Sequence, residues 1–200
     1  MSDHHQIRRL AVFCGSSVGT NPLYRDVARE LGQTLAERRI ELIYGGGGIG
    51  LMGVLADAVL AAGGEVTGVI PTGLASKEVA HSNLTALRVV RTMHERKAEM
   101  ADLADAFLAL PGGMGTFDEL FEILTWAQLG IHRKPIGLLN IDRYFDPLVA
   151  MVDHTVREGF VSPHHRGLVI VANTVDDWFS RLAAYDPPAV STRWIGMQEV

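Results

Sequence analysis

The stretch AFLALPGGMGTFDELFEILTWAQ, residues 106–128, joins two different hydrophobic patterns through a glycine-rich turn. Residues 106–110 form a short, continuous apolar run, which is typical of a strand buried on both faces of a parallel sheet. From Thr116 to Gln128 apolar residues recur at helical spacing, which predicts an amphipathic helix. A strand that passes directly into a helix is half of a β-α-β unit, so this stretch predicts a layered α/β fold.

The same alternation continues along the rest of the chain. Strands are expected at residues 10–14, 41–44, 66–70, 87–90, 106–110, 136–139 and 168–171. Helices are expected to begin at Asn21-Pro22 and to cover residues 51–62, 93–104, 116–128, 145–158 and 175–184. The pattern predicts a doubly wound, mostly parallel sheet of about seven strands flanked by helices. No linker divides the chain, so we expect a single domain over residues 1–200, with residues 1–6 and 187–200 as loose or docked tails.

Composition excludes several classes of protein. The chain has 200 residues, 48% of them apolar and 20% charged, which are ordinary values for a globular domain. A formal net charge of −5 argues against a nucleic-acid binder or a polybasic membrane surface. There is no apolar run of membrane-spanning length and no signal-peptide pattern, and Cys14 is the single cysteine. We therefore expect a cytoplasmic protein.

Two glycine-rich turns follow predicted strands, and each has two interpretations. The run GGGGIG, residues 45–50, formally matches the dinucleotide fingerprint, but the acid expected at the end of the next strand is missing. Its glycines equally suit a tight turn with close helix packing, and we expect a mixed role. The turn PGGMGT, residues 111–116, suits a monophosphate at a bare helix N-terminus. Alternatively, Thr116 and Glu119 form a capping box that only stabilises the helix.

A second polar cluster lies in RTMHERKAEM, residues 91–100. Thr92 and Glu95 have capping-box spacing, which places Arg96 and Lys97 near the start of the next helix. The two cations either form a solvated basic face or face a bound anion. On the helix after the PGGMGT turn, Glu122 and Thr125 follow Glu119 at helical spacing and suit ribose hydroxyls if they face the ligand.

These stretches together resemble one family. PGGMGTFDE is similar to the PGGxGTxxE motif, and MHERKAEM to the MHERK motif, of the LOG (Lonely Guy) phosphoribohydrolases, formerly called lysine decarboxylase-like. Segments such as FCGSSVGTNPLY and YGGGGIGLMG extend the resemblance over nearly the whole chain. It implies a Rossmann-like fold, a homodimer, and hydrolysis of N6-substituted adenosine 5′-monophosphates, with AMP as a further substrate, to the free base and ribose 5-phosphate.

The resemblance also implies roles for individual residues. The catalytic pair falls on Arg96 and Glu119. Substrate binding falls on Glu78, Arg96, Lys97, Gly113, Met114, Gly115, Thr116, Phe117, Asp118, Glu119 and Thr125. No cofactor and no metal is implied, since the histidines show no ligand spacing.

Other activities were weighed against this one. A decarboxylase needs a lysine that carries pyridoxal phosphate, and none of Lys77, Lys97 and Lys134 lies in a context that suggests it. Two alternatives stay open at this point. One is a nucleotide-binding protein without catalysis, and the other is an NAD-dependent oxidoreductase that uses the Gly45–Gly50 loop.

Overall fold

The computed structural model describes residues 7–75 and 80–188, and within them seven strands form one sheet. The strands are β1 (Arg9–Phe13), β2 (Glu41–Tyr44), β3 (Val66–Pro71), β4 (Ala86–Val90), β5 (Ala106–Ala109), β6 (Ile136–Leu139) and β7 (Val169–Ala172). Their order is β4-β3-β2-β1-β5-β6-β7, and all six pairings are parallel. The sheet expected to be mostly parallel is thus entirely so, apart from an isolated antiparallel bridge between Gly47 and Ala80.

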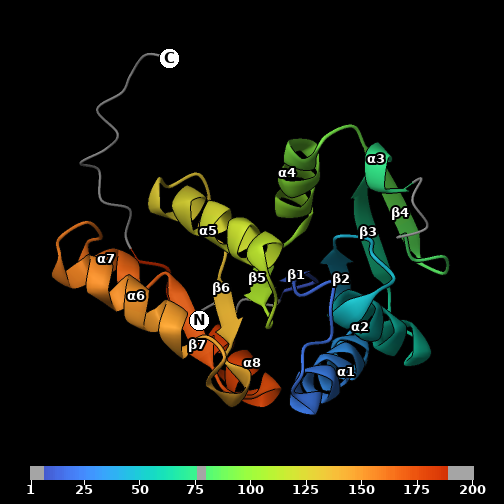
Figure 1. Cartoon of the computed structure of the whole chain (residues 1–200), viewed down its shortest axis with the longest axis horizontal. Coiled ribbons are helices and arrows are strands. Elements are labelled where there is room, and N and C mark those ends of the chain that lie inside the picture. Colours follow the sequence, from blue (N-terminus) through green and yellow to red (C-terminus); the bar gives the residue numbers. More distant parts are fainter. Residues whose placement is uncertain (1–6, 76–79, 189–200) are drawn as a thin grey trace, which may run out of the picture.

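Helices cover both faces of this sheet (Figure 1). The elements are α1 (Pro22–Glu37), α2 (Gly50–Ala61), α3 (Thr72–Ala75), α4 (Met93–Leu103), α5 (Met114–Gln128), η1 (Ile141–Arg143), α6 (Asp146–Arg157), α7 (Pro163–Arg166) and α8 (Val175–Ala183). Buried side chains of α1, α2 and α8 share one core with the sheet. Side chains of α4, α5 and the start of α6 share the other. This arrangement is the doubly wound α/β fold that the sequence predicts.

The central strand β1 shows why the sequences of the strands are short apolar runs. Leu10 and Val12 pack into the core beneath α1 and α2, whereas Ala11 and Phe13 pack into the core beneath α4 and α5. Side chains alternate between the faces of a strand, and here helices cover both faces, so the four positions after the exposed Arg9 are all apolar.

The strands begin and end within one residue of their predicted positions. The helices differ from the prediction in two respects. Helix α5 begins at Met114 rather than Thr116, because the extended residue that precedes the helix is Gly113. The short helices α3, η1 and α7 were not expected, since three or four residues carry no recognisable period.

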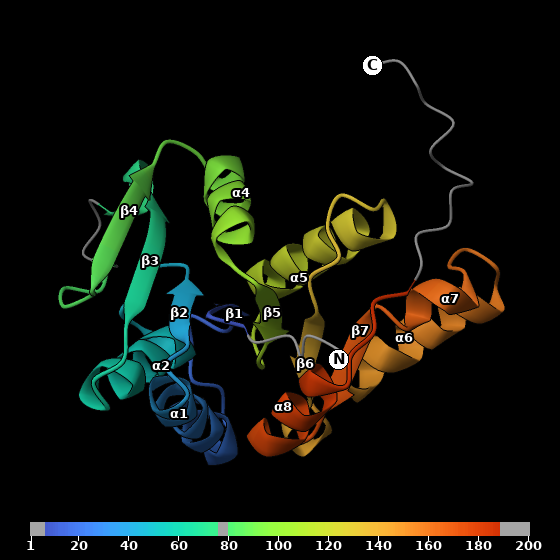
Figure 2. The same ribbon diagram turned by 180° about the vertical axis from the view of Figure 1, so that it is seen from behind.

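The strand order reverses at the centre of the sheet. From β1 the chain builds outward through β2, β3 and β4, and then returns to place β5 on the other side of β1 (Figure 2). Phe13 of β1 is paired with Ala109 of β5, so the loops that follow these two strands emerge side by side. Ligands of open α/β sheets bind at such a switch point, outside the carboxyl ends of the strands.

None of the helices within residues 7–75 and 80–188 has the length and apolar character needed to cross a membrane.

Candidate active site

The N-terminus of α5 lies at the switch point and is open. Gly113 is the N-cap residue and has no side chain to cap the helix. Among the described residues, none accepts a hydrogen bond from the backbone N–H groups of Met114, Gly115 or Thr116. Free N–H groups and the helix dipole together favour an anion at this position.

The second interpretation of this turn, a capping box between Thr116 and Glu119, is wrong. Because α5 begins at Met114, both residues lie inside the helix, and Thr116 is not an N-cap. The physical reason is that the extended Gly113 starts the helix at Met114, whereas a threonine cap would start it at Phe117, nearly one turn later. Both side chains are buried. Because the side chain of Glu119 does not cap the helix, it is available for another partner.

The glycines of this turn fall into two kinds. A Cβ atom added at Gly112 would collide with Thr116 Oγ1 and would lie 2.8 Å from the backbone nitrogen of Gly15, so this glycine is needed for packing. A Cβ atom added at Gly113 or Gly115 would meet nothing within 4 Å. Neither of these two has a left-handed backbone, so internal packing does not require glycine there. Their surroundings leave room for close approach by a ligand.

The glycines of residues 45–53 contrast with these, because the chain itself fills their surroundings. Gly46 and Gly50 have positive φ angles of 75° and 64°. A Cβ atom at Gly50 would collide with the Ser16 carbonyl, and one at Gly53 with the Gly48 carbonyl. Structural needs thus account for Gly46, Gly50 and Gly53, so Gly50, the last glycine of the fingerprint, needs no dinucleotide to explain it.

Helix α4 brings two cations toward α5. Thr92 is its N-cap, and its side chain accepts a hydrogen bond of 3.1 Å from the backbone N–H of Glu95. This half of the predicted capping box is confirmed. The carboxylate of Glu95 accepts a hydrogen bond of 2.8 Å from the backbone N–H of Arg91. The cap fixes where α4 starts and so fixes the direction of the next residue, Arg96.

Arg96 and Glu119 form an ion pair between α4 and α5. Their side chains are only 12% and 9% exposed, which rules out the first of the two alternatives, a solvated basic face, for Arg96. The guanidinium also lies against Gly45, where an added Cβ atom would be 3.3 Å from it. Burial lowers the pKa of Arg96, and the charge of Asp118 opposes this shift. The buried Nε of Arg96 has no hydrogen-bond partner among the described residues, so the pair has a donor to spare.

Lys97 makes a second bridge between the same helices. Its Nζ lies 3.2 Å from Asp118 and 3.0 Å from Glu122, and its side chain is 10% exposed. Burial alone would lower the pKa of Lys97, but hydrogen bonds to Glu122 and Asp118 outweigh it and leave this pKa raised. The bridges of Arg96 and Lys97 hold α4 and α5 together beside the glycine turn.

The structure therefore brings most of the predicted site residues together. Arg96, Lys97 and residues 113–119 meet at the start of α5, where Met114 is 84% exposed and Phe117 packs on the core. Thr125 lies six residues, or about 240° around the helix axis, beyond Glu119, and its hydroxyl donates to the Phe121 carbonyl at 2.7 Å. Glu78 lies outside the described residues.

A crevice of about 280 Å³ opens beside the turn, between the loops that follow β1 and β5. Its lining comprises Gly15, Ser16, Ser17, Val18, Gly19, Tyr24, Leu51, Pro111, Gly112, Gly113 and Tyr144. The family segment FCGSSVGTNPLY covers residues 13–24, which include part of this lining, but none of them was named as a site residue. Tyr144 comes from the end of η1 and lies outside the segments that resemble the family, so sequence reasoning missed it.

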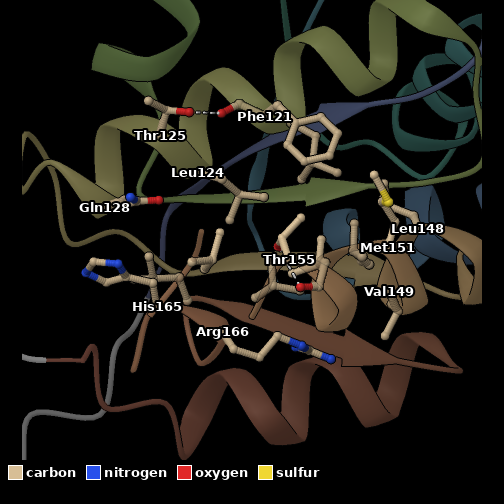
Figure 3. A pocket seen from close by; sticks show the side chains of 16 residues that line it. Phe121, Leu124, Thr125, Gln128, Leu148, Val149, Met151, Thr155, His165 and Arg166 are labelled. Atoms are coloured by element: carbon tan, nitrogen blue, oxygen red, sulfur yellow. Dashed lines mark hydrogen bonds between the residues drawn. The ribbon is translucent and has the colours of Figure 1, made fainter. Parts of the chain in front are cut away.

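A second cavity, of about 310 Å³, lies between α5, α6 and β7 and is mainly apolar (Figure 3). Phe121, Leu124 and Thr125 of α5 face Leu148 and Met151 of α6 across it. It is larger than the crevice, and neither cavity is lined by Arg96 or Glu119. The ion pair of these two residues instead lies beside the start of α5.

Lysine and cysteine chemistry finds little support. Lys97 is held by two carboxylates. Lys134, which shortly precedes β6 and lies away from the turn, donates a hydrogen bond of 2.7 Å from Nζ to the Ala101 carbonyl. Lys77 lies outside the described residues. Burial raises the pKa of the Cys14 thiol to about 12, which suits an inert packing residue. Within residues 7–75 and 80–188, no group of three His, Cys, Asp or Glu side chains is arranged to hold a metal ion.

Comparison with solved structures identifies the fold. The molybdenum cofactor carrier protein of Chlamydomonas reinhardtii has a TM-score of 0.66 at 22% identity, over 88% of this chain and 98% of that protein. A molybdenum cofactor binding protein of Rippkaea orientalis has the same TM-score at 18% identity, over 88% and 95%. At these identities the likeness concerns the fold alone.

Comparison of sequences identifies the family. A family model described as "Possible lysine decarboxylase" matches residues 52–182. The rice (Oryza sativa subsp. japonica) protein named probable cytokinin riboside 5′-monophosphate phosphoribohydrolase LOGL5 is 52% identical over 183 residues, or 92% of this chain and 74% of that protein. The Arabidopsis thaliana phosphoribohydrolase LOG7 is 50% identical over 182 residues, or 91% and 84%. The chain thus belongs to the LOG family of cytokinin riboside 5′-monophosphate phosphoribohydrolases.

Proposed function

We propose that this protein hydrolyses the N-glycosidic bond of N6-substituted adenosine 5′-monophosphates, and of AMP, to release the free base and ribose 5-phosphate. The observation that carries the proposal is the buried Arg96–Glu119 pair beside the open N-terminus of α5. The family's named activity and the motifs around both residues support the same assignment.

The 5′-phosphate binds at the start of α5 in this proposal. The N–H groups of residues 113–116 have no acceptor in the described chain, and the glycines there allow an anion to approach the backbone. Lys97, paired with Asp118 and Glu122, holds α4 against this end of the site. Glu78 completes the proposed set of binding residues, whereas Thr125 faces the apolar cavity beside α6 and does not reach the turn within one subunit.

Glu119 acts on the ribose. Cleavage passes through an oxocarbenium-like sugar, which a carboxylate at C1′ stabilises electrostatically. As water adds to C1′, Glu119 accepts its proton, and the C1′–N9 bond breaks with its electron pair leaving on the base, which then takes up a proton. Arg96 holds Glu119 in place and offers its free Nε to the substrate. A guanidinium is too weak an acid to donate the proton itself, so Arg96 contributes charge and orientation.

Product analysis tests the proposal. Wild-type protein incubated with N6-isopentenyl-AMP, or with AMP, is expected to release base and ribose 5-phosphate in equal amounts, as measured by liquid chromatography. Release of nucleoside and inorganic phosphate would instead identify a phosphatase. Tight binding of the nucleotide without turnover would identify a non-catalytic binding protein.

We further propose that the protein is a cytoplasmic homodimer that pairs through the apolar cavity between α5 and α6. Phe121 and Met151 border this cavity and are 43% and 58% exposed, which is unusual for large apolar side chains unless a partner covers them. A second copy is the proposed partner because the family resemblance implies a homodimer and an isologous contact would pair the two apolar cavities. The free, buried thiol of Cys14 suits a reducing compartment.

Met151→Glu is expected to separate the dimer. A symmetric interface places the new charge there twice without a partner, which raises the dimer dissociation constant about a hundredfold or more. Light scattering after gel filtration measures the mass, with Leu23→Glu on α1 as the control, since Leu23 is 48% exposed on the other side of the sheet. A monomeric wild type, or a Met151→Glu variant that stays dimeric, would contradict the proposed interface.

A further inference from the structure

Tyr144 reaches the glycine turn from a part of the chain far away in sequence. It follows two left-handed residues, Asp142 and Arg143, at the end of η1. A side-chain hydrogen bond holds the backbone next to Tyr144 in place, because Asn140 Oδ1 accepts a 2.7 Å hydrogen bond from the N–H of Phe145. The Tyr144 ring packs edge-to-face on Tyr24, with ring centroids 5.6 Å apart. The ring is therefore held rigidly against the crevice.

The hydroxyl of Tyr144 donates a hydrogen bond to the backbone carbonyl of Gly112. The preceding carbonyl, that of Pro111, accepts a hydrogen bond of 3.1 Å from the backbone N–H of Gly15. Both carbonyls that lead into α5 are thus held by the rest of the protein. Glycine at 112 and 113 would otherwise leave this turn with a wide choice of backbone conformations.

Holding the Gly112 carbonyl also fixes the next N–H group. The carbonyl of Gly112 and the N–H of Gly113 belong to one planar trans peptide, so they point in opposite directions. With the carbonyl directed at Tyr144, the N–H of Gly113 is turned away from it. This N–H has no acceptor among the described residues, and Gly113 borders open space.

We propose that Tyr144 is a positioning residue that presents the N–H of Gly113 to the 5′-phosphate of the substrate. The proposal rests on the phosphate placement proposed above and adds a residue outside the motifs that identify the family. Tyr144 acts through the peptide plane and not on the reacting atoms. Its contribution therefore belongs to substrate binding and depends on the phosphate.

Tyr144→Phe tests this role, because phenylalanine keeps the ring and removes only the hydroxyl. The KM for N6-isopentenyl-AMP is expected to rise about tenfold, the effect of one misaligned hydrogen bond to a charged group. The kcat should stay within about twofold, and the kinetics with the riboside, which lacks the phosphate, should not change. Tyr185→Phe, which removes a phenol hydroxyl far from the turn, is the control and should match the wild type. An unchanged KM, or an equal loss with the riboside, would overturn the proposal.

Amide NMR separates this proposal from the proposed function. Ribose 5-phosphate is expected to shift the amide signals of Gly113 and Gly115 in the wild type, which supports the phosphate placement. In Tyr144→Phe the shift of Gly113 should shrink at saturation while that of Gly115 persists. Equal shifts of Gly113 in both proteins would overturn the role of Tyr144 and leave the phosphate placement intact. No shift in the wild type would overturn both.

Discussion

Replacing Glu119 by glutamine is expected to lower kcat for base release about a thousandfold, within the range that general-base and electrostatic groups contribute. Glutamine keeps the shape of the side chain and a carbonyl oxygen that Arg96 can bond. It lacks the charge that stabilises the sugar cation and cannot accept a proton from water. Initial rates with N6-isopentenyl-AMP measure the effect, and circular dichroism confirms that the variant is folded.

The matched control is Glu122→Gln. Glu122 lies one turn further along α5 and is paired with Lys97 rather than with Arg96. Its replacement removes the same charge from the same helix, yet kcat is expected to change by less than about fivefold, since Asp118 still pairs with Lys97 and the Arg96–Glu119 pair is untouched. If Glu119→Gln retained wild-type kcat, or if both variants lost activity equally, Glu119 would not have the proposed role.

Replacing Arg96 by methionine is expected to reduce both activity and stability. Methionine fills the space but leaves the carboxylate of Glu119 buried without its partner. Loss of one member of a buried pair typically costs about 3 kcal/mol of unfolding free energy. The kcat/KM for the nucleotide should fall about a hundredfold or more, because the carboxylate loses its orientation and the substrate loses a donor. Denaturant unfolding and steady-state kinetics measure the two effects.

The double variant Arg96→Met/Glu119→Gln separates these effects. Without the unpaired charge, the free energy of unfolding should recover by about 2 kcal/mol relative to Arg96→Met, whereas activity should stay as low as in Glu119→Gln. Losses of stability that simply add in the double variant would show that the two residues are not coupled. Recovery of activity would show that neither is needed for the chemistry.

The fold was largely predictable from the sequence because its signals are local. A strand such as β5 is an apolar run of four residues, and the helix after it has its own period, so both appear in a single stretch. The start of α5 was less predictable. Threonine followed three residues later by glutamate is a strong capping pattern, but Gly113 starts the helix first. Local propensity was overruled there by the backbone of the turn.

The site was predictable only in part, because its contacts join distant segments. Glu119 pairs with Arg96 across 23 positions of sequence, and Tyr144 reaches Gly112 across 32. Family motifs marked Arg96 and Glu119, but no spacing rule joins one to the other. Nothing in the sequence around Tyr144 points to the turn, since its role depends on how η1 packs beside the crevice. Side chains brought together by the sheet order become visible only in the folded protein.

The central claim is that the open start of α5 binds a 5′-phosphate while the Arg96–Glu119 pair cleaves the bond to the base. The most direct test compares kcat/KM of the wild-type protein for N6-isopentenyl-AMP and for its riboside, with the products identified. We predict at least about a hundredfold preference for the monophosphate, the effect of several charge-assisted hydrogen bonds, with ribose 5-phosphate as the sugar product. Equal values for the two substrates, or cleavage of the riboside alone, would contradict the account.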